Sequence, residues 1–356
     1  MNPSRNTLLL VCAALLAAGP AGADWDLRGF GTLAAVRSDE PRAAFKPDLL
    51  VTEGAEDGEL DWGMYSNLGV QLSWRAQRWA LTGQAVARRR GDADFEPDVD
   101  WLYLKWQPQD AVDLKLGRLV MPEFMISDYR FVGYALPTIG PPAQAYVYSA
   151  LTRFDGGQLG LQHDFGEVRL GVQASAGKTD ADFGFMGFDY TIDVTDIRSL
   201  NATLEYRDLL LRAAHLEAHF HVFDTQGNLA FMQDAEFDAL GARYDDGRWL
   251  VQGEWIDRKD LAEVYYLQLG RRFGAFQLTG TYTQADIRGF DLPDQRDVGG
   301  PALSLRYDLG STFAIKAQWE RVPTNAIWLW HSNDLMFYLQ PAQDRDIYSV
   351  ALDFLF

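Results

Sequence analysis

Four side chains that could bind a metal ion alternate along one short segment of the sequence. They are His215, Glu217, His219 and His221. Because they are spaced two residues apart, a β-strand would carry all of them on one face. Imidazole suits zinc, copper or nickel, but successive residues on one strand face stand about 6.5 to 7 Å apart, too far for a compact tetrahedral site built from neighbours alone. We therefore treat the three histidines as weak metal candidates, expect no cofactor, and interpret this face as polar lining of an interior whose charge responds to pH.

Hydrolytic chemistry has little support in the sequence. There are five histidines, and no Gly-x-Ser-x-Gly nucleophile elbow is present. We therefore expect no chemical step and no enzyme. A hydrolase with a His-assisted nucleophile or paired carboxylates stays open as an alternative.

A further group of charged side chains lies in or near segment 121–149. The segment holds the charged residues Glu123, Asp128 and Arg130 among aromatic side chains, followed by Pro137, Pro141 and Pro142. Apolar side chains would anchor such a segment to a wall, prolines would stiffen it, and the charges would face an opening. The basic residues that could face them are Arg88, Arg90 and Lys115. Charged side chains around an opening determine ion selectivity and need no catalytic chemistry.

The elements that must position these side chains have a hydrophobic period of two. In the last stretch of the chain one face carries Tyr348, Val350, Leu352, Phe354 and Phe356. The same alternation recurs from Trp25 onward, which predicts β-strands with one apolar and one polar face.

The alternation and the turn residues together predict sixteen strands. We expect them near 25–37, 64–76, 78–90, 98–107, 111–120, 150–164, 167–178, 193–207, 209–221, 235–245, 248–258, 262–273, 275–287, 299–309, 311–322 and 346–356. Every second connection is a tight turn with Gly, Asp or Pro. Most of the others are long, among them 38–63, 121–149, 179–192, 222–234 and 323–345.

These connections distinguish between two all-β architectures. A soluble sandwich would show the same alternation, whereas short turns on one rim and long loops on the other are typical of an outer-membrane barrel. We therefore predict an all-β fold, a transmembrane antiparallel β-barrel with short periplasmic turns and long extracellular loops. Tryptophans near strand ends favour lipid contact at headgroup depth: Trp74, Trp79, Trp101, Trp106, Trp249, Trp255 and Trp319.

The first 23 residues have the pattern of a secretory signal peptide. An apolar run from Leu8 to Ala18 follows Arg5 and leads to the small residues Ala21-Gly22-Ala23. This run is shorter than the roughly 20 residues that a membrane-spanning helix needs. We expect residues 1–23 to be removed and residues 24–356 to form a single barrel domain. The formal net charge of −18 argues against a nucleic-acid partner.

In these features the chain resembles the Gram-negative outer-membrane porins, particularly the gammaproteobacterial type with sixteen strands. The resemblance covers residues 24–356 and rests on the opening 25–32, on Leu116-Gly117-Arg118 before a long third loop, and on the terminal Phe356. A terminal Phe is similar to the signal that barrel assembly machinery recognises. The resemblance implies a Gram-negative outer-membrane location, a homotrimer, and a third loop, 121–149, that constricts the pore. It also implies passive diffusion of small hydrophilic solutes and ions, without identifying the solute.

Given a barrel, the strand faces assign the charged residues. We expect Glu123, Asp128 and Arg130 on the third loop to face Arg88, Arg90 and Lys115 across the gap. Arg89 would then point outward, either toward lipopolysaccharide phosphate or into solvent at a loop edge. Two alternatives stay open: the third loop could be a solvated lid, and the barrel could be adhesive or structural without an open pore.

Overall fold

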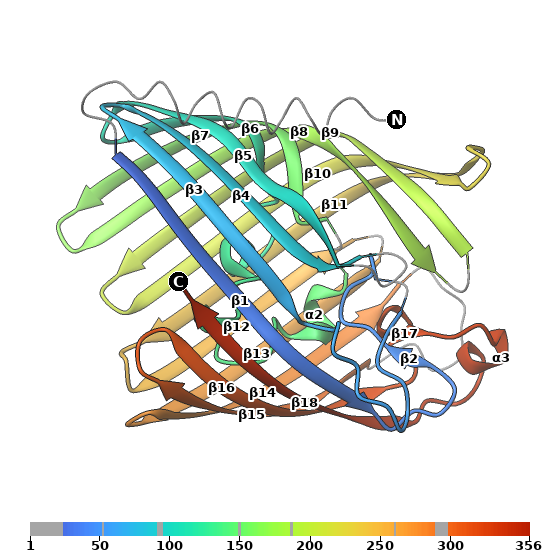
Figure 1. Ribbon diagram of the computed structural model, residues 1–356. Coiled ribbons are helices and arrows are strands. Elements are labelled where there is room, and N and C mark those ends of the chain that lie inside the picture. The colour runs from blue at the N-terminus through green and yellow to red at the C-terminus, as the bar shows by residue number, and fades with distance from the viewer. Residues whose placement is uncertain are drawn as a thin grey trace.

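The chain forms a closed barrel of sixteen antiparallel strands (Figure 1). The computed structural model describes residues 24–51, 53–90, 95–148, 151–185, 188–259, 261–288 and 298–356, so the predicted signal peptide lies outside the described residues. The barrel strands are β1 (Asp24–Ser38), β3 (Asn67–Ala76), β4 (Trp79–Arg89), β5 (Phe95–Gln109), β6 (Val112–Val120), β7 (Arg153–Phe165), β8 (Val168–Phe185), β9 (Phe188–Tyr206), β10 (Leu209–Asp224), β11 (Leu229–Asp245), β12 (Trp249–Arg258), β13 (Ala262–Phe273), β14 (Phe276–Ile287), β15 (Val298–Leu309), β16 (Phe313–Pro323) and β18 (Asp344–Leu355). All sixteen predicted strands are confirmed.

Short elements lie in the three longest loops. The third loop holds the 3₁₀ turns η1 (Ser127–Tyr129) and η2 (Gly133–Ala135) and the helix α2 (Ala143–Tyr146). The last long loop holds η3 (Ile327–Leu329), β17 (Trp330–His331) and α3 (Leu335–Tyr338), and β17 pairs with β2 (Ala44–Phe45) of the first loop. These two loops therefore meet at the end of the barrel opposite the tight turns (Figure 1). In the described part of the chain, no helix is long and apolar enough to cross a membrane.

The outer face of the barrel carries the apolar side chains that the alternation predicted. Examples on β13 to β16 are Tyr265, Leu267, Leu269, Leu303, Leu305 and Ile315, all of them exposed. At the tight-turn rim the rings of Trp79 and Trp106 stack with their centroids 5.7 Å apart. A closed sheet pairs its backbone amides internally, which hydrocarbon requires. Trp101 departs from the prediction, because it lines the interior.

Two hairpins are longer than predicted. The segments 179–192 and 222–234 were expected to be loops, but β8–β9 and β10–β11 continue through most of them. Figure 1 shows these hairpins extending past the neighbouring strands on the side of the long loops. The prediction was wrong because it ended each strand where the apolar face that suits lipid came to an end.

Along β10 the inward face changes from polar to apolar and the outward face from apolar to polar, while the side chains continue to alternate with a period of two. Near the tight turn, Arg212 points inward and donates to the Pro122 carbonyl of the third loop at 2.6 Å. Further along, the inward positions are apolar and buried, as at Leu216 and Ala218. The outward positions there are His215, Glu217, His219 and His221. The expectation that these histidines line the interior is therefore wrong: they lie on the outside of the barrel.

The first and last strands close the barrel through glycine and aromatic pairs. Gly31 on β1 lies beneath the ring of Phe354 on β18, and a Cβ added to Gly31 would collide with that ring. Inside the same seam, Thr32 donates to Asp353 at 2.6 Å. Asp353 also pairs with Lys316 of β16 at 2.7 Å, and both side chains are buried. The seam therefore has an aromatic outer surface and a charged, hydrogen-bonded inner surface.

Candidate functional site

The third loop lies inside the barrel. It leaves β6 at Met121, returns at β7, and its helix α2 is enclosed by the strands (Figure 1). Apolar residues explain this position, because the Phe124 ring packs edge-on against Phe237 of β11 with centroids 5.5 Å apart. The rings of Phe124 and Tyr146 also pack together, with their centroids 4.2 Å apart. The inward apolar positions of the outer half of the wall thus bury the apolar face of the loop.

One buried carboxylate fixes both ends of the loop to β12. Glu254 accepts hydrogen bonds from the Met125 amide at 2.6 Å and from the Tyr146 hydroxyl at 2.8 Å. The hydroxyl of Tyr266 on β13 donates to the same carboxylate at 2.7 Å. A buried carboxylate with three donors is satisfied and holds the loop at a defined height.

Two basic side chains fix the middle of the loop to β15 and β16. Lys316 donates to the carbonyl of Gly133 at 2.6 Å and to that of Thr138 at 2.9 Å. Arg306 donates to the carbonyls of Tyr134 at 2.6 Å and Leu136 at 3.0 Å. These four bonds satisfy carbonyls that the irregular backbone would otherwise leave unpaired.

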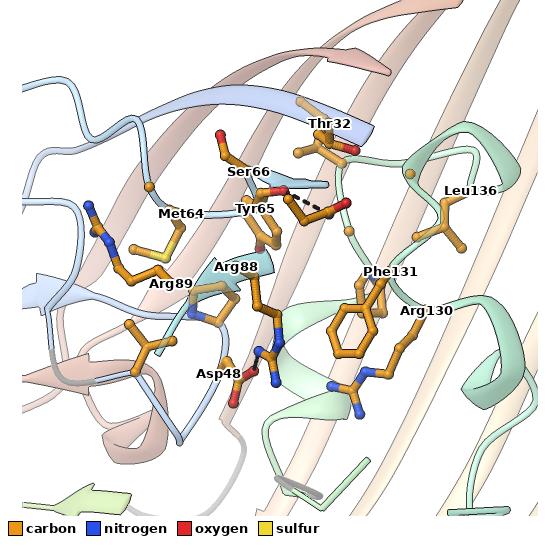
Figure 2. Close-up of a pocket in the computed structure, with 18 of the residues that line it drawn as sticks. Thr32, Asp48, Met64, Tyr65, Ser66, Arg88, Arg89, Arg130, Phe131 and Leu136 are labelled. Atoms are coloured by element: carbon orange, nitrogen blue, oxygen red, sulfur yellow. Dashed lines mark hydrogen bonds and ion pairs between the residues drawn. The ribbon is translucent and has the colours of Figure 1, made fainter. Parts of the chain in front are cut away.

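One side of the loop faces a cavity of about 90 Å³, called here the arginine cavity. Arg88 of β4 and Arg130 of the third loop both line it, with Phe131 between them (Figure 2). The guanidinium carbon of Arg88 lies 4.5 Å from the centre of the Phe131 ring, and that of Arg130 lies 5.4 Å from it. Cation–π contacts of this kind hold a guanidinium against a ring without neutralising it.

The first loop supplies a carboxylate to the arginine cavity. Asp48 accepts from Arg88 at 2.6 Å. Burial opposes ionisation of Asp48, but the charges of Arg88 and Arg130 keep its pKa below the ordinary value. The carboxylate is therefore ionised at neutral pH.

The other side of the loop faces a larger cavity of about 540 Å³, called here the wide cavity. Lys115 and Asp128 both line it, and Lys115 donates to Gln158 of β7 at 2.9 Å. Other charged lining residues come from the wall: Asp113, Arg169, Glu205 and Arg212. Both signs of charge are therefore present in the wide cavity.

The six predicted site residues divide among different places. Arg88 and Arg130 share the arginine cavity, and Lys115 and Asp128 share the wide cavity. Arg90 lines neither: it pairs with Asp98 of β5. Glu123 is buried, and that burial raises its pKa to about 7 against the opposing charges of nearby arginines.

The outward placement of Arg89 that the alternation predicted is wrong. Its guanidinium pairs with Asp61 of the first loop and is largely buried. It also lines the arginine cavity. The alternation failed here because the first loop folds over the end of β4, where neither face meets lipid. Sequence reasoning also missed Asp48 and Glu254 as partners, since nothing in their local spacing indicates the third loop.

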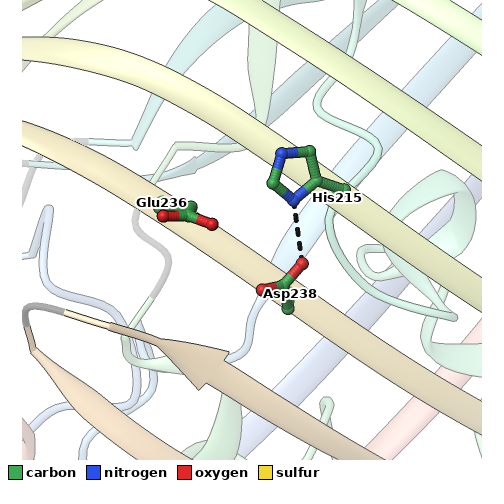
Figure 3. A group of neighbouring side chains, drawn as sticks. All are labelled: His215, Glu236 and Asp238. Atoms are coloured by element: carbon green, nitrogen blue, oxygen red, sulfur yellow. Dashed lines mark hydrogen bonds and ion pairs between the residues drawn. The ribbon is translucent and has the colours of Figure 1, made fainter.

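The histidine face forms a group on the outer surface of β10 and β11. His215 Nδ1 lies 2.8 Å from Asp238, with Glu236 beside them (Figure 3). Lys259 pairs with Glu236 and lies 3.7 Å from Asp238. The ammonium group thus compensates only one of the two negative charges of these carboxylates, and His219 pairs separately with Asp234 at 2.6 Å.

Comparison with known proteins gives structural neighbours only. No protein-family model and no curated protein sequence matches the chain. The outer-membrane channel DcaP of Acinetobacter baumannii matches with a TM-score of 0.59 and 13% identity, over 95% of this chain and 99% of that one. OmpF of Salmonella typhi, solved with daunomycin, matches with a TM-score of 0.61 and 12% identity, over 94% and 98%. An anion-selective porin from Comamonas acidovorans matches with a TM-score of 0.58 and 14% identity, over 94% and 100%.

At these identities the likeness extends to the fold, and it covers nearly the whole length of each chain. It agrees with the closed barrel of sixteen antiparallel strands. The chain has the sixteen-stranded barrel fold of the Gram-negative outer-membrane porins.

Proposed function

We propose that the chain is an outer-membrane channel through which small hydrophilic solutes and ions diffuse passively. The observation that carries this proposal is the position of the third loop. It is fixed inside the barrel by Glu254, Lys316 and Arg306, and charged cavities lie on both sides of it. A loop held at a fixed height with charges beside an opening is what a selective constriction needs.

The proposal includes no chemical step. The two histidine–carboxylate pairs of β10 and β11 lie on the outer surface, so no enclosed space surrounds them. Binding of lipopolysaccharide and assembly as a homotrimer also belong to the proposal. The trimer is supported by a solved neighbour, a trimer form of an outer membrane protein from Vibrio cholerae.

Conductance tests the channel directly. The protein, folded in detergent and inserted in a planar bilayer, is expected to give discrete current steps, and liposomes that contain it are expected to swell in small sugars faster than in large ones. A heat-unfolded sample is the control for detergent leakage. Folded and inserted protein that carries no current at any voltage would refute the channel. Hydrolysis of ester or peptide substrates by the same sample would instead favour the enzyme alternative.

The trimer has its own measurement. Sedimentation of the folded protein in a density-matched detergent is expected to give three times the mass of one chain. A single-chain mass together with full conductance would remove the trimer and leave the channel.

A further inference from the structure

The arginine cavity contains hydrogen-bond donors that the protein does not use. Arg88 is buried, and only its Nη1 is bonded, to Asp48. Its Nε and Nη2 have no partner in the described part of the chain, and neither does the buried Nε of Arg130. Buried N–H groups without an acceptor are unfavourable and rare. Donors of this kind on two side chains indicate a missing acceptor.

The two guanidinium groups are close enough to act on one small molecule. Both contact the Phe131 ring, so their central carbons lie within about 10 Å of each other. In Figure 2 both guanidinium groups lie below the Phe131 ring. Arg130 is also held by Tyr146, whose ring centre is 5.9 Å away. The rings fix the directions of the donors in advance, which lowers the entropic cost of binding.

Among the basic side chains that line this cavity, Arg130 differs in having no ion pair with a described residue. Asp48 pairs with Arg88, Asp61 with Arg89, and Asp353 with Lys316. Arg130 makes no hydrogen bond or ion pair with a described residue, although the charges of Asp48 and Glu123 act on it from a distance. Arg130 is therefore free to form an ion pair, and a guanidinium binds carboxylate or phosphate through two parallel hydrogen bonds.

The remaining lining combines polar side chains, among them Thr32, Ser66 and Asn67, with apolar ones. Met64, Leu136 and Ile139 contribute to the cavity wall beside Phe131. The cavity of about 90 Å³ has room for several water molecules or for one small anionic group. The lining therefore favours an oxyanion that carries an apolar part over a bare inorganic ion.

We infer that the arginine cavity is a binding subsite for the oxyanion group, carboxylate or phosphate, of a small solute that crosses the barrel. The inference rests on the proposed channel function and names the class of solute that the constriction retains. Arg88 and Arg130 bind the oxyanion, and Phe131 positions both of them and contacts the apolar part of the solute.

Transient block of single-channel current tests the inference. Sodium benzoate, inorganic phosphate and neutral benzamide are added in turn to the inserted protein. Benzoate is expected to interrupt the current in a concentration-dependent way, and benzamide is not. Arg130→Gln and Arg88→Gln are expected to weaken the block by about tenfold or more, since each removes charge-assisted bonds. Lys115→Gln, which removes the same charge from the wide cavity, is the matched control and is expected to change the block less than twofold.

The outcomes separate the two proposals. Absence of conductance in the unaltered protein refutes the channel. Conductance without any block by benzoate or phosphate, or a block that Lys115→Gln weakens as much as Arg130→Gln does, overturns the subsite and leaves the channel standing. Block by benzoate alone identifies carboxylates as the solute class, and block by phosphate alone identifies phosphates. Arg130→Lys keeps the charge but not the two parallel bonds, so partial retention of the block is expected.

Discussion

Loss of the Glu254 carboxylate is expected to release the third loop while the barrel stays closed. Glu254→Ala removes three hydrogen bonds. The hydroxyl of Tyr266 loses its acceptor but still accepts from the Gln252 side chain at 2.9 Å, whereas the Met125 amide and the Tyr146 hydroxyl lose their partner. Two buried groups left without partners cost about 1–3 kcal/mol each. We expect docking of the loop to weaken by about 3 kcal/mol, which raises the population of the detached loop about 100-fold.

Two measurements follow that population. Proteolysis of the folded protein is expected to cut within 121–149 much faster in Glu254→Ala than in the unaltered chain, and single-channel current is expected to become larger and noisier. The temperature at which the folded protein unfolds in detergent, measured as loss of the folded band on a gel, is expected to stay unchanged, because the strand pairing is intact. Glu205→Ala is the control: Glu205 also lines the interior, and it makes no hydrogen bond with a described residue. Equal cleavage and equal current in Glu254→Ala and Glu205→Ala would refute the anchor.

Three further predictions concern pH, strand packing and the outer surface. Burial raises the pKa of Glu123 to about 7, so its ionised form opposes docking of the loop. The docked loop is therefore expected to become more stable as pH falls from 8 to 6, and the reversal potential in a salt gradient is expected to move toward anion passage. Glu123→Gln is expected to abolish this shift. Gly31→Ala is expected to displace the Phe354 ring and destabilise the barrel by about 1–3 kcal/mol, measured as the temperature at which the folded gel band disappears. Gly280→Ala, where an added Cβ meets nothing within 4 Å, is its control. His215→Ala is expected to leave conductance and its pH profile unchanged, because His215 lies outside the barrel; an altered profile would contradict that placement.

The barrel could be predicted from the sequence because lipid and the interior impose opposite chemistry on alternate residues. Leu267 and Leu269 face outward and Gln268 faces inward, and the amino-acid sequence alone shows this alternation of apolar and polar residues. The rule fails where the outer medium changes along a strand. His215 lies beyond the apolar belt, so its polarity reports water on the outside and not an interior. A hydrophobic period of two shows which residues share a face of the strand. It does not show whether that face meets lipid, water or the barrel interior.

The contacts of the site could be predicted only in part. The third loop and its charged residues were visible in composition and prolines, but Asp48 and Arg88 are 40 positions apart and Met125 and Glu254 are 129 apart. No local pattern connects residues at such separations, because closure of the barrel and the path of the first loop bring them together.

The seam between β1 and β18 sets an order of events during folding. Thr32 and Asp353 are 321 positions apart, and Asp353 also holds the lysine that binds the Gly133 carbonyl of the third loop. The entropy of closing so long a segment has to be overcome before these contacts form. The Lys316 anchor of the third loop is therefore complete, with its buried carboxylate partner, only when the last strand of the chain has joined the first. A truncated chain that lacks the last strand would keep the Glu254 and Arg306 bonds but would leave Lys316 without its carboxylate, so the final position of the constriction is set in the last step of folding.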